Sequence, residues 1–383
     1  MPENKNQHFV PKYHLRRFGF SDGHVIRLLH LPSGRVIRGA PIKKQCSDAY
    51  FYGKDSLIDE LLQDAERKEG IIVKNIVESQ TLPRRDTMES HLLYRMAALF
   101  SSRTARAANS IAAKTDAVLA ETVEILKRSD ILPAPPEGVS LDDFKLRSHN
   151  DWNACQAVQS SMTGFIHLLD LNLKILRPPS GSEFITSDHP SVLINQALFG
   201  KVRPPHSATG FALRGLQVVL PIDPQICLFF YDEDVYRVGP KNAHTIVQLD
   251  AGNLELLNAL QVLNGGDHLY FQDPRMETSV RKLVQRFSSL RSPISQPDKI
   301  PTSSGAYVVA SNPEIPIPGN WSFCKVRPRR GIELTLSLRR PEFSRNVSKW
   351  QSTRVRGGLH ITLEQFLSDP EMRRNLEHLS RSR

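Results

Sequence analysis

The sequence predicts an α+β protein with an amino-terminal β hairpin, a helical layer, a mixed β-sheet and a basic carboxy-terminal extension. Two β-rich runs, 24–31 and 35–42, flank the turn-forming residues Pro32-Ser33-Gly34, which is typical of a hairpin. No proline or glycine interrupts residues 84–132, and this indicates a helical region. The mixed sheet is expected in the β-rich part of the chain from about 183 to 273.

The uninterrupted region predicts a helix from about Thr87 to Lys127. At roughly 1.5 Å per residue a single helix would approach about 60 Å, so we expect two helices or the spine of a helical layer. Asp86 and Glu89 have the spacing of a capping box. Arg103 stands where the apolar stripe of the helix would continue. Its guanidinium must be paired or reach a cavity, because burying an unpaired charge is costly; the alternative is an arginine that snorkels at the edge of the layer.

The rest of the body alternates helical and β-rich segments. Residues 183–186 predict a strand that leads into Ser187-Asp188-His189-Pro190, with 191–194 as its continuation. The other predicted elements are helices at 151–173, 253–264 and 276–290 and strands at 216–222, 225–231, 245–249 and 268–271.

Composition divides the chain into a body, residues 1–291, and a Pro-rich linker with a basic extension, residues 292–383. A proline-rich break predicts a sub-boundary near 131–140. The stretch 325–356 carries ten Lys or Arg against two Glu, which is most of the net charge of +10. A strand at 332–338 and a helix at 362–379 are predicted in the extension.

The overall composition is that of a soluble globular protein, with 40% hydrophobic and 23% charged residues. No apolar run reaches the roughly 18 residues that span a bilayer, and the polar amino end does not resemble a secretory signal. Four cysteines without a Cys-x-x-Cys pair argue against a disulfide framework or a zinc site. We therefore expect a cytoplasmic protein without a membrane span.

The densest group of chemically active side chains is QHFVPKYHLRRF, residues 7–18. A neutral imidazole is a competent general base near pH 7, so His8 is the candidate acid/base. Asp188 is its candidate orienting carboxylate, and Arg103 is the third predicted catalytic residue. The alternatives are structural: His8 ties the amino terminus to a sheet, and Asp188 accepts backbone N–H groups in a loop.

Three further residues are candidates for substrate binding. Arg16 matches phosphate geometry bidentately and Lys12 adds a second positive charge. Ser187 is a conceivable nucleophile, although it lacks the Gly-x-Ser-x-Gly turn that would expose it. Arg16 and Arg17 have a simpler alternative as part of a solvated basic face.

The sequence predicts no cofactor and no metal ligand. It contains no His-Glu-x-x-His motif, EF-hand loop or Cys-His cluster, and it lacks both the phosphate-binding loop with lysine and the Gly-x-Gly-x-x-Gly fingerprint. The acidic runs at 142–143 and 232–234 leave divalent-metal binding open.

The basic extension suggests contact with a polyanion. Trp and Phe side chains are interspersed among its arginines, and this combination offers phosphate pairing with stacking surfaces. The alternatives are a solvated extension or docking to an acidic protein partner. The predicted nucleic-acid contacts are Arg327, Arg329, Arg330, Arg339 and Arg340.

Four short motifs occur in a recognisable order: QHFVPKYHLRRF, EFITSDHPSVLI, the turn at Pro221–Asp223, and Asn258 ahead of the aromatic strand near Tyr270. Together they resemble the bacterial family of unknown function DUF4238 over roughly residues 7–273. The resemblance implies a shared fold and a shared site, but no established activity. This chain has His14 where an aromatic is usual and His189 where Asn is usual, so neither is expected to take part in core chemistry.

Two functions from different classes follow. The first is a metal-independent or weakly metal-assisted nuclease acting on RNA or DNA, in bacterial defence or toxicity, with His8, Asp188 and Arg103 at its centre. The second is a non-catalytic module that binds nucleic acid or protein, in which the same residues hold the fold. The two differ in whether the distant motifs converge on one concave pocket.

Overall fold

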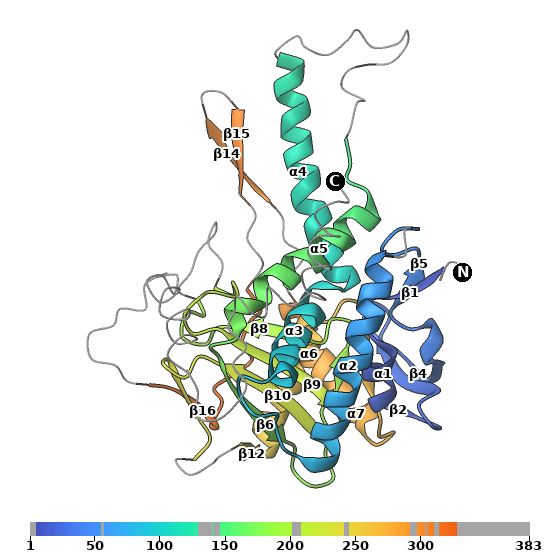
Figure 1. Ribbon diagram of the computed structural model, residues 1–383, viewed down its shortest axis with the longest axis vertical. Helices are drawn as coiled ribbons and strands as arrows, with labels where there is room; N and C mark the ends of the chain where they lie inside the picture. The colour runs from blue at the N-terminus through green and yellow to red at the C-terminus, as the bar shows by residue number, and fades with distance from the viewer. Residues whose placement is uncertain are drawn as a thin grey trace.

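The computed structural model describes residues 5–54, 57–128, 140, 146–200, 208–240, 245–291, 297–302, 305–309 and 314–327. In these residues helices pack against two separate five-stranded sheets (Figure 1). The predicted α+β class is confirmed.

The first sheet contains the predicted hairpin. It consists of β2 (Gly19–Phe20), β3 (Val25–His30), β4 (Arg35–Pro41), β7 (Thr186–Ser187) and β13 (His268–Phe271). The order is β2-β3-β13-β7 with β4 paired to β3, and every pairing is antiparallel. The amino-terminal hairpin therefore shares a sheet with strands from the middle and the end of the body.

The second sheet is mixed. It consists of β6 (Asn172–Arg177), β8 (Val192–Ile194), β9 (Gln217–Asp223), β10 (Ile226–Tyr231) and β12 (Ile246–Gln248), in the order β12-β6-β10-β9-β8. Only the β12–β6 pairing is parallel. The helix predicted over 151–173 is wrong at its end: α5 (Asn150–Gly164) and a 3₁₀ turn, η3 (Phe165–Leu168), give way to β6. The strand was missed because Leu173, Ile175 and Leu176 continue the apolar content of the helix without a break residue.

The segment predicted as one strand with its continuation is divided between the two sheets. β7 belongs to the first sheet and β8 to the second, so residues 188–191 cross from one to the other. Pro190 lies within this crossover, where the chain has left the first ladder and has not joined the second. We call residues 183–191 the crossover segment.

The helical layer consists of α2 (Leu57–Ser79), α3 (Met88–Ser102) and α4 (Ala105–Arg128). The expected long helix is thus two helices, broken at Arg103 and Thr104. The predicted Asp86 cap is wrong by one position, because Thr87 accepts the hydrogen bond from Ser90 N while Asp86 takes a left-handed φ of 66°. Figure 1 shows α4 extending away from the sheets.

The remaining elements are short or peripheral. At the amino end β1 pairs with β5, and η1 lies against α1. Their bounds are β1 (Asn6–His8), α1 (Lys12–Arg17), η1 (Ile42–Lys44), β5 (Ser47–Ala49), β11 (Tyr236–Val238), α6 (Ala251–Asn264), α7 (Met276–Phe287), η4 (Ser288–Leu290), β14 (Asp298–Thr302), β15 (Gly305–Val309) and β16 (Cys324–Val326).

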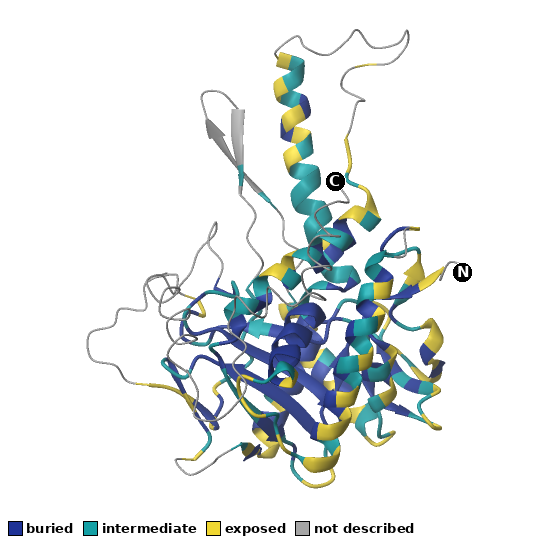
Figure 2. Cartoon of the chain, in the orientation of Figure 1, coloured by how far each residue is buried: buried dark blue, intermediate teal, exposed yellow. Residues whose placement is uncertain are grey.

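Both faces of the second sheet are buried (Figure 2). Cys227 and Phe229 of β10 pack with α6, whereas Leu228 and Phe230 pack with α3. This alternation along one strand joins the α6 side and the α3 side into one folded body.

Residues 314–327 return to the same core. The rings of Trp321 and Phe323 stack with centroids 5.4 Å apart, and both meet Phe229 edge-on at 5.9 and 5.5 Å. β16 then pairs with β11. The folded body therefore extends beyond residue 291, into the region whose proline content had suggested a linker. The sub-boundary near 131–140 and the elements at 332–338 and 362–379 lie outside the described residues, apart from residue 140.

Candidate functional site

Arg103 caps the carboxyl end of α3 and is 1% exposed. Its Nη2 donates to Glu66 Oε1 at 2.7 Å and to the carbonyl oxygen of His8 at 2.8 Å. Burial would lower the pKa of Arg103, but Tyr52 and Glu66 hold it above its usual value. The guanidinium is therefore paired, which is one of the alternatives that its position on the apolar stripe left open, and it binds the backbone of β1 to the α2–α3 layer.

The imidazole of His8 is closed off from solvent. The residue is 8% exposed, and neither buried ring nitrogen has a hydrogen-bond partner in the described residues. Burial first, then the charge of Lys12, lower the pKa of His8 to about 4; the Gln45 backbone opposes this shift, and Arg103 adds a smaller lowering effect. His8 is thus neutral at pH 7 but cannot reach a substrate in this conformation.

Asp188 binds the turn before β13. Its Oδ1 accepts from Gly266 N at 2.7 Å, and its Oδ2 accepts from Asp267 N at 2.7 Å and His268 N at 3.1 Å. Burial would raise the pKa of Asp188, but the hydrogen bonds from His268, Asp267 and Gly266 lower it below its ordinary value. The carboxylate is ionised and occupied by backbone amides, which is the structural alternative for this residue.

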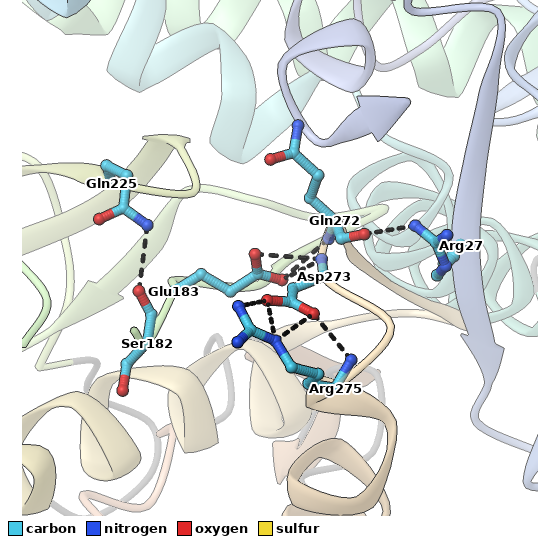
Figure 3. A network of polar contacts seen from close by, with 7 residues as sticks. All are labelled: Arg27, Ser182, Glu183, Gln225, Gln272, Asp273 and Arg275. Carbon is cyan, nitrogen blue, oxygen red and sulfur yellow. Dashed lines mark hydrogen bonds and ion pairs between the residues drawn. The ribbon is translucent and has the colours of Figure 1, made fainter. Parts of the chain in front are cut away.

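Glu183 accepts backbone N–H groups at the other end of β13. Its Oε1 accepts from Gln272 N and Asp273 N, both at 2.9 Å, while Arg27 donates to the Gln272 carbonyl (Figure 3). Because β7 runs antiparallel to β13, two carboxylates five residues apart on the crossover segment meet opposite ends of one strand. The EFITSD motif is recognisable in the sequence, but this role of Glu183 is seen only in the structure.

Three amides on one face of α6 hold the rest of the crossover segment. Asn258 exchanges hydrogen bonds with Glu183 O (3.0 Å) and Ile185 N (3.1 Å). Gln261 accepts the Ser187 hydroxyl at 2.8 Å and donates to Pro190 O at 2.9 Å. Asn264 donates to His189 O at 2.7 Å. The signal for these residues was present as polar side chains at i, i+3 and i+6 of an otherwise apolar helix.

Ser187, proposed as a conceivable nucleophile, is fully buried. Its hydroxyl donates to Gln261, and its oxygen accepts from His189 N at 3.2 Å. These contacts fit a structural role within the crossover segment.

The amino-terminal motif and the EFITSDHP motif do contact each other, but through hydrogen bonds that hold the fold together. His14 of α1 and Thr186 of β7 are joined by a 3.0 Å hydrogen bond between Nε2 and Oγ1. Burial lowers the pKa of His14 to about 3, so the ring is neutral. No hydrogen bond or ion pair among the described residues joins Asp188 to His8 or Arg103.

A basic groove lies on the outer side of α1. Two adjoining cavities of about 360 and 450 Å³ share Lys12 and Lys43 in their walls; Arg16 lines the first and Lys44 the second. Lys12 and Arg16 stand four residues apart on α1, while Lys43 and Lys44 belong to η1. We define Lys12, Arg16, Lys43 and Lys44 as the basic groove.

All four cations of the basic groove are exposed, and none forms an ion pair with a carboxylate in the described part of the chain. The alkyl stem of Arg16 covers Gly23, whose φ is 74° and where a Cβ would approach Arg16 Cγ to 3.1 Å. The structure therefore brings together the predicted substrate-binding residues Lys12 and Arg16, and it adds two lysines that the sequence did not single out.

The framework motifs are those of a known family. A family model described as "Protein of unknown function (DUF4238)" matches residues 6–275. The chain belongs to the DUF4238 family. The expected family is confirmed, and the crossover segment and its α6 amides lie inside the matched region. Comparison with curated proteins and with solved structures gives no match.

A separate cavity of about 360 Å³ opens beside α4 in this DUF4238 chain. His189 lines it together with Arg106 and Lys114 of α4. Burial first, then the charge of Arg106, lower the pKa of His189 to about 4, although Asp188 opposes this. His189, which was not expected to take part in core chemistry, lines this pocket.

The basic extension is described only at its start. Arg327 donates from Nε to the Tyr236 carbonyl at 3.0 Å, and its backbone N–H binds Val235 O at 2.8 Å. Arg329, Arg330, Arg339 and Arg340 lie outside the described residues. No three His, Cys, Asp or Glu side chains in the described ranges are grouped closely enough to hold a metal ion. None of the described helices is both long and apolar enough to cross a membrane.

Proposed function

We propose that this DUF4238 protein is a non-catalytic nucleic-acid-binding module that contacts phosphates through the basic groove. The observation that carries the proposal is the gathering of four exposed cations, Lys12, Arg16, Lys43 and Lys44, with no carboxylate partner among the described residues. A groove of one charge sign attracts and holds a polyanion through its backbone.

The local energetics support a ligand at this place. Lys12 and Arg16 are like charges at i, i+4 on a short helix, an arrangement that destabilises an isolated helix by about 0.2–0.5 kcal/mol. Cations on the α7 side of the molecule are instead paired: Glu277 accepts both Arg38 and Arg281 at 3.1 Å. Phosphate groups would neutralise the charges that this fold leaves unpaired.

The contacts of the predicted catalytic residues favour binding over cleavage. The His8 ring nitrogens are buried, and Arg103 is engaged by Glu66 and the His8 carbonyl. Asp188 accepts three backbone amides. A general base must come within hydrogen-bonding reach of the proton that it removes, and these groups are turned toward the framework.

The basic extension is a second source of phosphate contacts in this proposal. Arg329, Arg330, Arg339 and Arg340 follow the docked Arg327, so they start from a fixed point on β11. The extension is best tested by truncation after Arg327. Truncation at the composition boundary near residue 291 would also remove Trp321 and Phe323, which belong to the core.

The experiment measures the salt dependence of binding by fluorescence anisotropy, with labelled single-stranded RNA and duplex DNA of about 20 nucleotides, between about 50 and 200 mM salt. The groove variant is Lys12→Gln, Arg16→Gln and Lys43→Gln together. Each phosphate contact contributes about −0.7 to −0.9 to the slope of log K against log[salt], so three lost contacts should make this slope shallower by about 2–3 units.

A matched control removes three cations that are paired with carboxylates: Arg38→Gln, Arg275→Gln and Arg281→Gln. It has the same net charge as the groove variant, and we expect its salt slope to change by less than about one unit. Equal losses in the two variants would show that only net charge matters and would overturn the groove proposal. Strand cleavage that His8→Ala abolishes would favour the nuclease instead.

A further inference from the structure

The cavity beside α4 is formed by elements that are distant in the sequence. Arg106, Ser110 and Lys114 stand at i, i+4 and i+8 on one face of α4, and His189 of the crossover segment lines the cavity with them. No Asp or Glu occurs among the described residues of the wall. A site with cations and no carboxylate favours an anionic ligand.

His189 contributes its imidazole to the wall of this cavity. The side chain is 9% exposed, its Nδ1 is bonded to Thr104 Oγ1, and Nε2 is the ring nitrogen without a partner in the described residues. The Thr104 oxygen also accepts from Ala107 N at 3.3 Å, and Thr104 is fully buried. When the Thr104 hydroxyl donates its proton to Nδ1, the proton of a neutral His189 lies on Nε2, and this is the tautomer that suits an anionic ligand.

The first turn of α4 also favours an anionic ligand in the cavity. Arg106 and Ala107 of this turn line the cavity, where the dipole of α4 favours a negative charge. The Ser110 hydroxyl makes no hydrogen bond to any described residue, so it is available as a donor. The nearby carboxylate of Asp188 is already bound by three backbone amides.

The other walls are apolar. Phe211, Leu193 and Ile315 face the cavity together with Ile111 of α4. Lys114 lies two turns beyond Arg106, at roughly 12 Å along the helix axis. A volume of about 360 Å³ is at the small end of the range for small-molecule sites. The occupant would therefore combine one compact anionic group with a small apolar body.

We propose that this cavity binds a small organic phosphate, with its phosphate among Arg106, Ser110 and the Nε2–H of His189 and its apolar body against Phe211 and Leu193. Arginine is suited to the phosphate because its planar N–H groups match two phosphate oxygens. Lys114 provides a second positive charge at the far end. The site is separate from the basic groove and does not depend on nucleic-acid binding there.

The test is isothermal titration calorimetry of the full chain with phenyl phosphate, which carries a phosphate on an apolar ring. Benzoate replaces the phosphate by a carboxylate on the same ring, and phenol removes the charge. We expect one binding site for phenyl phosphate, weaker binding of benzoate and no binding of phenol. Arg106→Gln should weaken phenyl phosphate about tenfold or more, and Ser110→Ala about threefold.

Two controls isolate the site. Arg128→Gln removes an exposed cation at the other end of α4 and should change the affinity by less than about twofold, whereas the triple groove variant should leave it unchanged. Failure of phenyl phosphate to bind, or equal binding of benzoate, would overturn the assignment. Should Arg106→Gln fail to fold, wild-type affinity in the folded Ser110→Ala variant would overturn it as well. Loss of phenyl phosphate in the groove variant would assign the ligand to the groove.

Discussion

The crossover segment and the basic groove are both rich in polar side chains, but they differ in where their hydrogen bonds and charges are directed. In the crossover segment Glu183, Ser187 and Asp188 are bound by backbone amides or by Gln261 of α6. In the groove, Lys12 and Lys43 face solvent without a carboxylate partner among the described residues. The crossover segment therefore serves the fold, while the groove retains charge for a ligand.

The difference explains why a conspicuous motif can be structural. The EFITSDHP run must leave one sheet and enter another, so its backbone lacks regular ladder partners over several residues. Buried backbone groups without partners are costly, and polar side chains at fixed spacings replace the missing ladder. Chemically active residue types accumulate there for a reason unrelated to catalysis.

The largest effect is expected at the ion pair between the buried Arg103 and the partly buried Glu66, which joins α2 to the end of α3. Glu66→Gln leaves the guanidinium of Arg103 buried without its charge partner, and removing one partner of such a pair costs about 3–5 kcal/mol. Urea unfolding followed by circular dichroism measures the loss. Glu78→Gln on the same helix, whose partner Lys74 is 3.9 Å away at the surface, should cost less than about 0.5 kcal/mol.

A smaller loss is expected at the crossover segment. Asp188→Asn keeps one acceptor oxygen but loses the charge and leaves an amide of the 266–268 turn without its acceptor, at a cost of about 2–3 kcal/mol. The exposed Asp267→Asn is the control, expected within about 0.5 kcal/mol. An unchanged free energy of unfolding in Asp188→Asn would contradict the structural role.

The same variant makes a pH prediction. Because the pKa of Asp188 is lowered in the folded state, its stabilisation is present above the unfolded-state pKa of about 3.9 and is lost as pH falls through the lower folded-state pKa. The difference in unfolding free energy between wild type and Asp188→Asn should therefore narrow below about pH 4. Urea titrations at a series of pH values measure it; a gap that widens on acidification would refute this assignment.

The smallest effect on stability is expected in the basic groove. The triple variant of Lys12, Arg16 and Lys43 should unfold within about 0.5 kcal/mol of wild type, or be slightly more stable at low salt, because like charges are removed. Urea unfolding at low and high salt distinguishes the two cases, since screening by salt should raise the free energy of unfolding of the wild type toward that of the variant. A loss of more than about 1 kcal/mol would mean that these cations are structural after all.

Local sequence patterns predicted much of the secondary structure. The hairpin follows from its turn residues, and the strands at β9, β10 and β13 follow from β-branched and aromatic runs that end at turns. The position of Arg103 on an apolar stripe left three alternatives, a paired guanidinium, one that reaches a cavity and one that snorkels at the edge of the layer, and the structure shows the first. The sequence did not identify Glu66 as the partner of Arg103. The residue spacing within α2 does not show which of its side chains faces the end of α3.

The sequence by itself determined the α+β class, the family and the residue types available for chemistry, because periodicity, turn residues and short motifs are local properties. Only the tertiary structure decided that β7 and β8 join different sheets, that Asp188 is held by the turn before β13, and that Lys12 and Arg16 meet Lys43 across a groove. These are contacts between residues from about 30 to 80 positions apart, and their partners are set by how the layers pack.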